Sequence, residues 1–124
     1  MSNDSIFFKA RIITGAGRGK GLGAPTLNMK LIDVPGVLKY GIYACRVRID
    51  GMYYKGAMHF GPRPVFDNSI ACEVHLLDIE IAAPPFIEIE VIKKLREVQN
   101  FESEEALKAQ IMKDITDVRE LVQD

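Results

Sequence analysis

Only the C-terminal part of the chain shows the periodicity of an α-helix. Ser103 precedes this part as a candidate N-cap, and Glu104 and Glu105 suit the positive end of a helix. Apolar residues then recur at i, i+4, i+8, i+11 and i+15, on one helical face, at Leu107, Ile111, Ile115, Val118 and Val122. Such a stripe has to be buried, so the rest of the chain must offer it an apolar surface.

Short strand-like segments fill the chain before this helix. The clearest pattern is at 41–49, where apolar and arginine side chains alternate before a hairpin turn signal at Asp50-Gly51, and 52–58 returns as a strand. Further strands are expected at 6–13, 70–77 and 86–93, with Gly/Pro loops at 61–64 and 84–85. Short antiparallel strands followed by one helix predict a mainly β protein, a small barrel with the helix packed on it.

Composition limits the function classes. The 124 residues, with 48% hydrophobic and 27% charged residues, suit one globular domain over 1–124. A formal net charge of −1 argues against nucleic-acid or membrane partners, and no apolar run reaches the ~20 residues that span a bilayer. Cys45 and Cys72 lie in apolar runs, which predicts buried, reduced thiols. We therefore expect a cytoplasmic protein, a monomer, that binds small molecules.

Residues 15–28 carry the strongest functional signal. Five glycines alternate with other residues from Gly15 to Gly23, and together with Lys20 they offer backbone N–H groups and positive charge to phosphate oxygens. The segment ends in Pro-Thr-Leu-Asn, where the Thr26 hydroxyl suits a hard metal ion. Neither the Walker loop nor the dinucleotide fingerprint fits this spacing. On its glycines alone, the segment is equally compatible with a flexible surface loop.

Glu73 is the candidate for proton transfer. Strand alternation places it on the opposite face from Cys72 and Val74, beside Ala71 and Leu77. Such apolar neighbours desolvate a carboxylate in part, which favours a role as proton acceptor. The alternative is an ordinary exposed glutamate on a strand.

Arg96 and Phe101 lie between the last strand and the helix. A guanidinium and an aromatic ring at this place can hold a flat ring by stacking and hydrogen bonding, while the alternative for Phe101 is packing on the helix stripe. His59 and His75 lack a Cys or Asp at metal-ligand spacing. They are expected to be packed structural histidines.

These segments together resemble the riboflavin kinase family, which makes FMN from riboflavin and ATP. The glycine-rich segment resembles the family loop that ends in Pro-Thr-x-Asn, and 41–43 resembles its Gly-Val-Tyr strand. Residues 60–64 are similar to its Ile-Gly-x-x-Pro turn, 71–78 to its Val-Glu-Val-His-Leu-Leu-Asp strand, and 95–103 to its Leu-Arg…Lys-Phe-x-Ser entry into the helix. The order and spacing of these motifs, over nearly the whole chain, make the resemblance specific.

The resemblance implies a fold and a set of roles. The fold is a six-stranded antiparallel Greek-key β-barrel with a C-terminal α-helix. The resemblance implies that Gly15 and Lys20 bind the ATP phosphates, and that Thr26 and Asn28 bind the Mg²⁺ ion that bridges to ATP. It implies that Leu76 and Asp78 contact the nucleotide, and that Glu73 removes the proton of the ribityl 5′-hydroxyl. The residues implied to bind the flavin are Arg96, Gln99 and Phe101.

Two other function classes remain open at this point. One is a barrel of the same family that binds a flavin or a nucleotide without turnover, and the other is an oligonucleotide-binding barrel, which the net charge disfavours. The family often carries an Asp-x-Tyr-Gly segment after the glutamate strand, and residues 81–86 stand here in its place. We expect a chain of this length to stop at FMN, without a domain that converts FMN to FAD.

Overall fold

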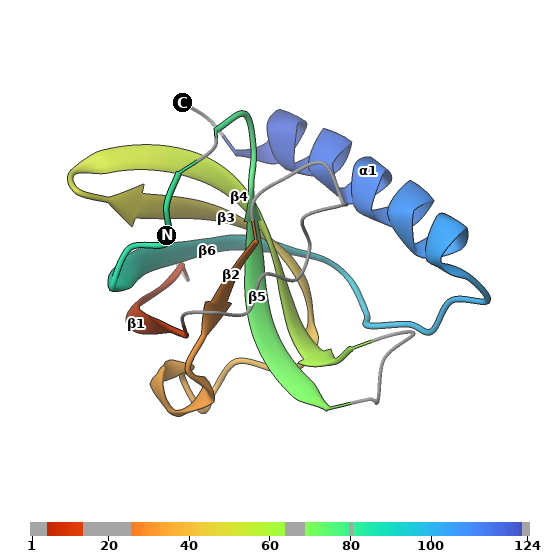
Figure 1. The fold of residues 1–124 in the computed structure, drawn as a ribbon, viewed down its shortest axis with the longest axis horizontal. Coiled ribbons are helices and arrows are strands. Elements are labelled where there is room, and N and C mark those ends of the chain that lie inside the picture. Colours follow the sequence, from red (N-terminus) through yellow and green to blue (C-terminus); the bar gives the residue numbers. More distant parts are fainter. Residues whose placement is uncertain (1–4, 14–25, 64–68, 80, 123–124) are drawn as a thin grey trace.

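Six antiparallel strands close into a barrel, and one helix lies on its outer surface (Figure 1). The computed structural model describes residues 5–13, 26–63, 69–79 and 81–122. Its elements are β1 (Ile6–Ile13), β2 (Thr26–Met29), the short 3₁₀ turn η2 (Leu31–Asp33), β3 (Gly41–Ile49), β4 (Met52–Pro62), β5 (Ile70–Leu76), β6 (Phe86–Arg96) and α1 (Glu104–Leu121).

The order of strands around the barrel is β1-β2-β5-β4-β3-β6, and every neighbouring pair is antiparallel. Strands β3, β4 and β5 follow one another as neighbours, and β6 then returns to lie beside β3, which is the Greek-key arrangement. The expected six-stranded Greek-key barrel with a C-terminal helix is therefore confirmed. The β3–β4 hairpin turns at Asp50 and Gly51 with φ values of 50° and 81°, as the Asp-Gly signal predicted.

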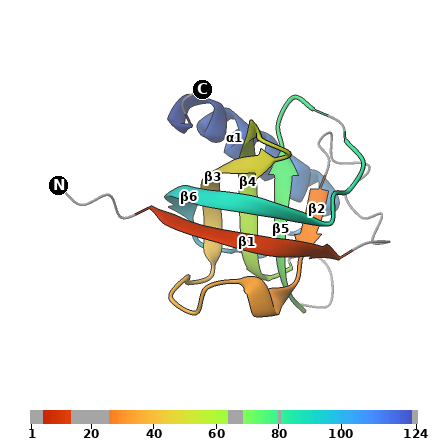
Figure 2. The same cartoon turned by 90° about the vertical axis from the view of Figure 1, so that its left-hand side faces the viewer.

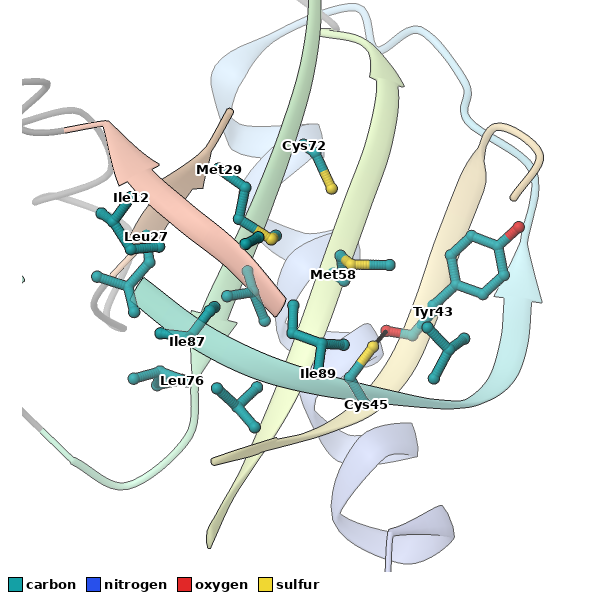
Figure 3. Packing of buried hydrophobic residues seen from close by; sticks show 14 of the residues in the cluster. Ile12, Leu27, Met29, Tyr43, Cys45, Met58, Cys72, Leu76, Ile87 and Ile89 are labelled. Carbon is teal, nitrogen blue, oxygen red and sulfur yellow. Dashed lines mark hydrogen bonds between the residues drawn. The ribbon is translucent and has the colours of Figure 1, made fainter. Parts of the chain in front are cut away.

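Alternating side chains from all six strands fill the inside of the barrel (Figure 3). On β5, Cys72, Val74 and Leu76 are fully buried in this core, so the predicted inner face of the strand is confirmed. Cys45 and Cys72 are free thiols, and burial raises the pKa of Cys72 to about 12. The expected buried, unpaired cysteines are therefore present.

Helix α1 covers the outside of the barrel over β3, β4 and β6 (Figures 1 and 2). The predicted stripe packs there against Ala44, Ala57 and Leu77, and burial of each aliphatic side chain of this size contributes about 1.5–3 kcal/mol. The small alanine side chains let the helix approach the sheet closely. The Ser103 hydroxyl accepts a hydrogen bond from the backbone N–H of Ala106 at 3.1 Å, which confirms the predicted N-cap.

One expected loop is instead part of a strand. Strand β4 continues through Gly61 and Pro62, which pair with Ala71 and Ile70. Gly61 has φ +140°, and an added Cβ there would lie 3.2 Å from the ring of Tyr40, so only glycine fits this turn of the strand. Proline is tolerated at the end of a strand, where its missing N–H costs little. The Gly-Pro signal therefore marks the end of strand β4, and Pro64 of the expected loop lies outside the described residues.

Candidate functional site

A row of outward-facing residues crosses five neighbouring strands of the barrel. Asn28 on β2 is paired with Glu73 on β5, Glu73 with His59 on β4, His59 with Ile42 on β3, and Ile42 with Arg96 on β6. Leu27, Met58 and Cys72, which are chain neighbours of Asn28, His59 and Glu73, point into the core. Because neighbouring strands are about 4.8 Å apart, Glu73 lies about one spacing from Asn28 and three spacings, roughly 14 Å along the curved sheet, from Arg96. We call this set the cross-strand row.

Thr26 stands next to the cross-strand row and shares its outward face. It precedes Asn28 by two residues on β2, so both side chains leave the same side of the strand. Its Oγ1 lies 2.9 Å from Nδ1 of His75, its register partner on β5. Burial lowers the pKa of His75 to about 4, so the ring is neutral near pH 7. With the ring proton on Nε2, Nδ1 accepts the Thr26 hydroxyl hydrogen and leaves the oxygen lone pairs available.

His75 is thus the packed, hydrogen-bonded histidine that the sequence predicted.

Within the described residues, no three His, Cys, Asp or Glu side chains gather in a way that could hold a metal ion. The Thr26 hydroxyl and the Asn28 amide still provide hard oxygen donors on one face. Mg²⁺ prefers such donors and takes few protein ligands when phosphates and water complete its octahedron. The two side chains therefore fit the ion that the family resemblance implies.

Glu73 lies half-buried between Asn28 and His59 in the cross-strand row. Its neighbours along β5 point into the core, so the strand turns the carboxylate outward, as predicted. The partial burial also agrees with the predicted partial desolvation. A carboxylate in this position can accept a proton from a group bound beside Asn28.

Arg96, Gln99 and Phe101, the three residues expected at a flavin ring, lie together in the structure. Nη1 of Arg96 is 3.5 Å from the Gln99 side-chain oxygen, and the guanidinium lies 5.8 Å from the centre of the Phe101 ring. The same guanidinium donates from Nε and Nη2 to the Asp114 carboxylate at 3.0 and 2.8 Å. Most of the hydrogen-bonding edge of Arg96 is therefore turned toward helix α1.

Asp114 is the partner that sequence reasoning missed. It is only 4% exposed, and it also accepts a hydrogen bond from Gln110 at 3.1 Å. A signal was present, because Asp114 lies directly before Ile115 and three residues after Ile111, on the apolar side of the helix. A buried carboxylate needs a cation, and that cation is Arg96.

Leu76 and Asp78 lie at the end of β5 in different surroundings. The Leu76 side chain is fully buried in the barrel core, so only its backbone is left for a bound ligand. Asp78 is exposed, with φ +62°, and it accepts a hydrogen bond from Arg119 of α1, which lowers the pKa of Asp78. Gly15 and Lys20 lie outside the described residues.

Among the described residues, no helix is long and apolar enough to cross a membrane.

Comparisons with known proteins agree with the motifs. The model of the family described as Flavokinase, riboflavin kinase, matches residues 2–122. The chain is similar to bifunctional riboflavin kinase/FMN adenylyltransferases of Haemophilus influenzae (34% identity, 85% of this chain and 35% of that one), Bacillus subtilis (32%, 87% and 36%) and Pseudomonas fluorescens (36%, 90% and 36%). It thus spans about a third of the length of these relatives.

Two solved structures share the fold. A riboflavin kinase from Trypanosoma brucei superposes with a TM-score of 0.62 at 19% identity, over 100% of this chain and 83% of that one. A protein described as a macrolide-efflux protein from Streptococcus pneumoniae gives a TM-score of 0.77 at 23% identity, over 91% of this chain and 38% of that one. Because the family model matches residues 2–122 and the family's motifs follow one another in order along the chain, the chain belongs to the riboflavin kinase family.

Proposed function

We propose that the chain transfers the γ-phosphate of ATP to the 5′-hydroxyl of riboflavin and so produces FMN and ADP. The observation that carries this proposal is the cross-strand row, which brings oxygen donors for a metal, a carboxylate and an arginine next to an aromatic ring onto one face of the barrel. Family membership supports the same reaction.

The end of the row on β2 and β5 is the proposed phosphate-transfer end. Thr26 and Asn28 would hold Mg²⁺, which when bound neutralises phosphate charge during transfer. With the His75 ring proton on Nε2, the Thr26 hydroxyl donates to Nδ1, so the oxygen lone pairs would remain for the ion. Gly15 and Lys20 are proposed to contact the ATP phosphates, and Asp78 and the Leu76 backbone to contact the nucleotide.

Glu73 is the proposed base. An alcohol is a poor nucleophile at neutral pH, and a positioned carboxylate that takes its proton accelerates the reaction typically ~10²–10⁴-fold. Glu73 lies one strand from Asn28, so a hydroxyl beside it would also be close to the phosphate held at the metal. This proximity would bring the hydroxyl and the phosphate together, and phosphoryl transfer depends mainly on such positioning.

The other end of the row is the proposed flavin end. Arg96, Gln99 and Phe101 would contact the isoalloxazine ring, with Phe101 and the flat guanidinium providing stacking surfaces. Three strand spacings, roughly 14 Å along the curved sheet, lie between Glu73 and Arg96. A tricyclic ring with a five-carbon polyol chain can bridge that separation, with the ring at Arg96 and the terminal hydroxyl at Glu73.

We propose that the protein acts as a monomer in the cytoplasm, as one kinase domain over 1–124 and without nucleic-acid partners. The free, buried thiols of Cys45 and Cys72 suit a reducing compartment.

The direct test is to incubate the protein with riboflavin, Mg²⁺ and ATP and to separate the flavins by chromatography. The proposal expects FMN to appear in amounts that depend on all three additions. Omission of Mg²⁺, with a chelator present, should abolish FMN formation. Riboflavin binding without FMN under any nucleoside triphosphate would refute the kinase and favour the barrel that binds without turnover.

A further inference from the structure

His59 occupies the middle of the cross-strand row, one strand from Glu73 and two strands from Arg96. Its ring is half-buried, and Nε2 lies 3.0 Å from the carbonyl oxygen of Pro62. A carbonyl oxygen can only accept, so Nε2 carries the hydrogen of this bond. In the neutral ring, Nδ1 is then a hydrogen-bond acceptor.

Nδ1 of His59 is buried and has no hydrogen-bond partner, and no other buried side-chain nitrogen or oxygen of the described residues is in this state. Burial lowers the pKa of His59, so the ring is neutral near pH 7 and Nδ1 keeps its lone pair. An acceptor that is removed from water without a donor destabilises the folded protein. A donor brought to it, once the atoms that cover it move aside, would therefore bind favourably.

The neighbouring arginines do not supply that donor. Arg96 and Arg63 are close enough to lower the pKa of His59 by their charge. Arg96 directs Nε and Nη2 to Asp114, and Arg63 donates to the Ser69 hydroxyl at 2.8 Å. Nδ1 of His59 is thus an acceptor near two arginines that donate to other groups.

We propose that Nδ1 of His59 accepts a hydrogen bond from a hydroxyl of the ribityl chain, and that His59 thereby recognises the polyol part of the flavin substrate. This inference rests on the proposed function, because it takes the flavin ring to Arg96 and the 5′-hydroxyl to Glu73. A chain that joins these two places passes His59, and each of its hydroxyls is a donor. A flavin without the polyol chain has no donor at this position.

Two amide variants separate the two nitrogens of the ring. In His59→Asn, the side-chain amide reaches the place of Nδ1 and can present an acceptor there, but it is too short to replace Nε2. In His59→Gln, the amide reaches the place of Nε2 and can donate to the Pro62 carbonyl, but it leaves no acceptor at Nδ1. Both variants are uncharged and polar, so each is a control for the other.

Binding is measured by flavin fluorescence without nucleotide, with riboflavin and with lumiflavin, which carries a methyl group in place of the ribityl chain. His59→Gln should weaken riboflavin binding about 10-fold and change lumiflavin binding less than about 2-fold, the effect of one hydrogen bond to the chain. His59→Asn should bind riboflavin within about 3-fold of the unmodified protein. Undiminished riboflavin binding by His59→Gln, or an equal loss for both flavins, overturns the proposal.

Ring-nitrogen NMR of the unmodified protein provides a second readout. The chain has two histidines, so the His59 signals can be assigned with one variant of His75. Riboflavin should shift the Nδ1 signal of His59, and lumiflavin should not. An unchanged signal with riboflavin overturns the proposal, and this would also be the result if a water molecule already donated to Nδ1. FMN formation without this shift refutes the role of His59 alone. The shift without FMN formation supports His59 and refutes the kinase reaction.

Discussion

At one end of the candidate site, Thr26, Asn28 and Glu73 lie on two paired strands; at the other end, Arg96 of β6 meets Asp114 of helix α1. Strand register alone aligns the first group, because β2 and β5 are hydrogen-bonded neighbours. The second group forms only when the helix docks on the barrel. Thr26, Asn28 and Glu73 should therefore depend less on the helix than the flavin end does, although Arg119 of α1 also donates to Asp78.

The largest expected effect is on chemistry at the phosphate-transfer end. Glu73→Gln should fold normally and lower kcat for FMN formation ~10²–10⁴-fold, because the proton acceptor is lost while the shape is kept. The readout is kcat with saturating riboflavin and ATP, together with the unfolding midpoint. Glu88→Gln is the matched control, an exposed strand glutamate outside the site, and it should keep full activity. Full activity of Glu73→Gln would remove Glu73 from the mechanism.

A change at the flavin end should act on stability and riboflavin binding together. Asp114→Ala leaves Arg96, 18% exposed, without its carboxylate and should lower the free energy of unfolding by about 3 kcal/mol. Denaturant unfolding measures this loss, and the KM for riboflavin should rise while the Mg²⁺ requirement stays the same.

Glu88→Ala provides the comparison for an ion pair, because its pair with Arg48 at 3.7 Å is half-exposed and should be worth less than about 1 kcal/mol. If Asp114→Ala raised the Mg²⁺ requirement as much as the KM for riboflavin, the two ends would not be separate.

Variants of His75, which pairs with Thr26, test the phosphate-transfer end. His75→Leu removes the acceptor and should raise the Mg²⁺ concentration for half-maximal activity about 10-fold, with little change in the KM for riboflavin. His75→Asn keeps an acceptor near the place of Nδ1 and should stay within about 3-fold of the unmodified protein. Binding of Mn²⁺ in the presence of ATP, followed by its paramagnetic signal, gives a readout independent of turnover. Equal metal affinity in both variants would contradict a role for His75 at Thr26.

The smallest effect is expected at the start of the helix. Ser103→Ala removes the N-cap and should lower the free energy of unfolding by about 1 kcal/mol. Because the helix begins next to Phe101, the KM for riboflavin should rise slightly and the Mg²⁺ requirement should not change. Ser103→Asp retains a capping oxygen and should behave like the unmodified protein. A change in Mg²⁺ requirement in Ser103→Ala would show that the helix also supports the phosphate-transfer end.

Much of this arrangement follows from local patterns in the sequence. Alternation on 41–49 and 70–77 predicted which side chains enter the barrel, and Asp50-Gly51 predicted the hairpin between β3 and β4. The direction of Glu73 follows from the same alternation, since its neighbours Cys72 and Val74 are apolar and buried. These features depend on residues close in sequence, so a single segment contains the information.

Other features depend on which segments meet. The pairing of Asn28 with Glu73 requires β2 to lie beside β5. The alternation of inward and outward side chains within each strand would also allow either strand to pair with a different strand. The inward direction of Leu76 also removes its side chain from any ligand, although the family motif includes it. Only the closed barrel decides these contacts.

The sequence by itself determined the alternating strands, the capped amphipathic helix and the residue types that a phosphate-transfer site needs, because strand and helix periodicity are properties of neighbouring residues. The tertiary structure decided that Asn28, Glu73, His59 and Arg96 form one row, that Asp114 holds Arg96, and that Nδ1 of His59 is left without a donor. The physical reason is that register, burial and the partners of buried charges are set when the barrel closes and the helix covers it.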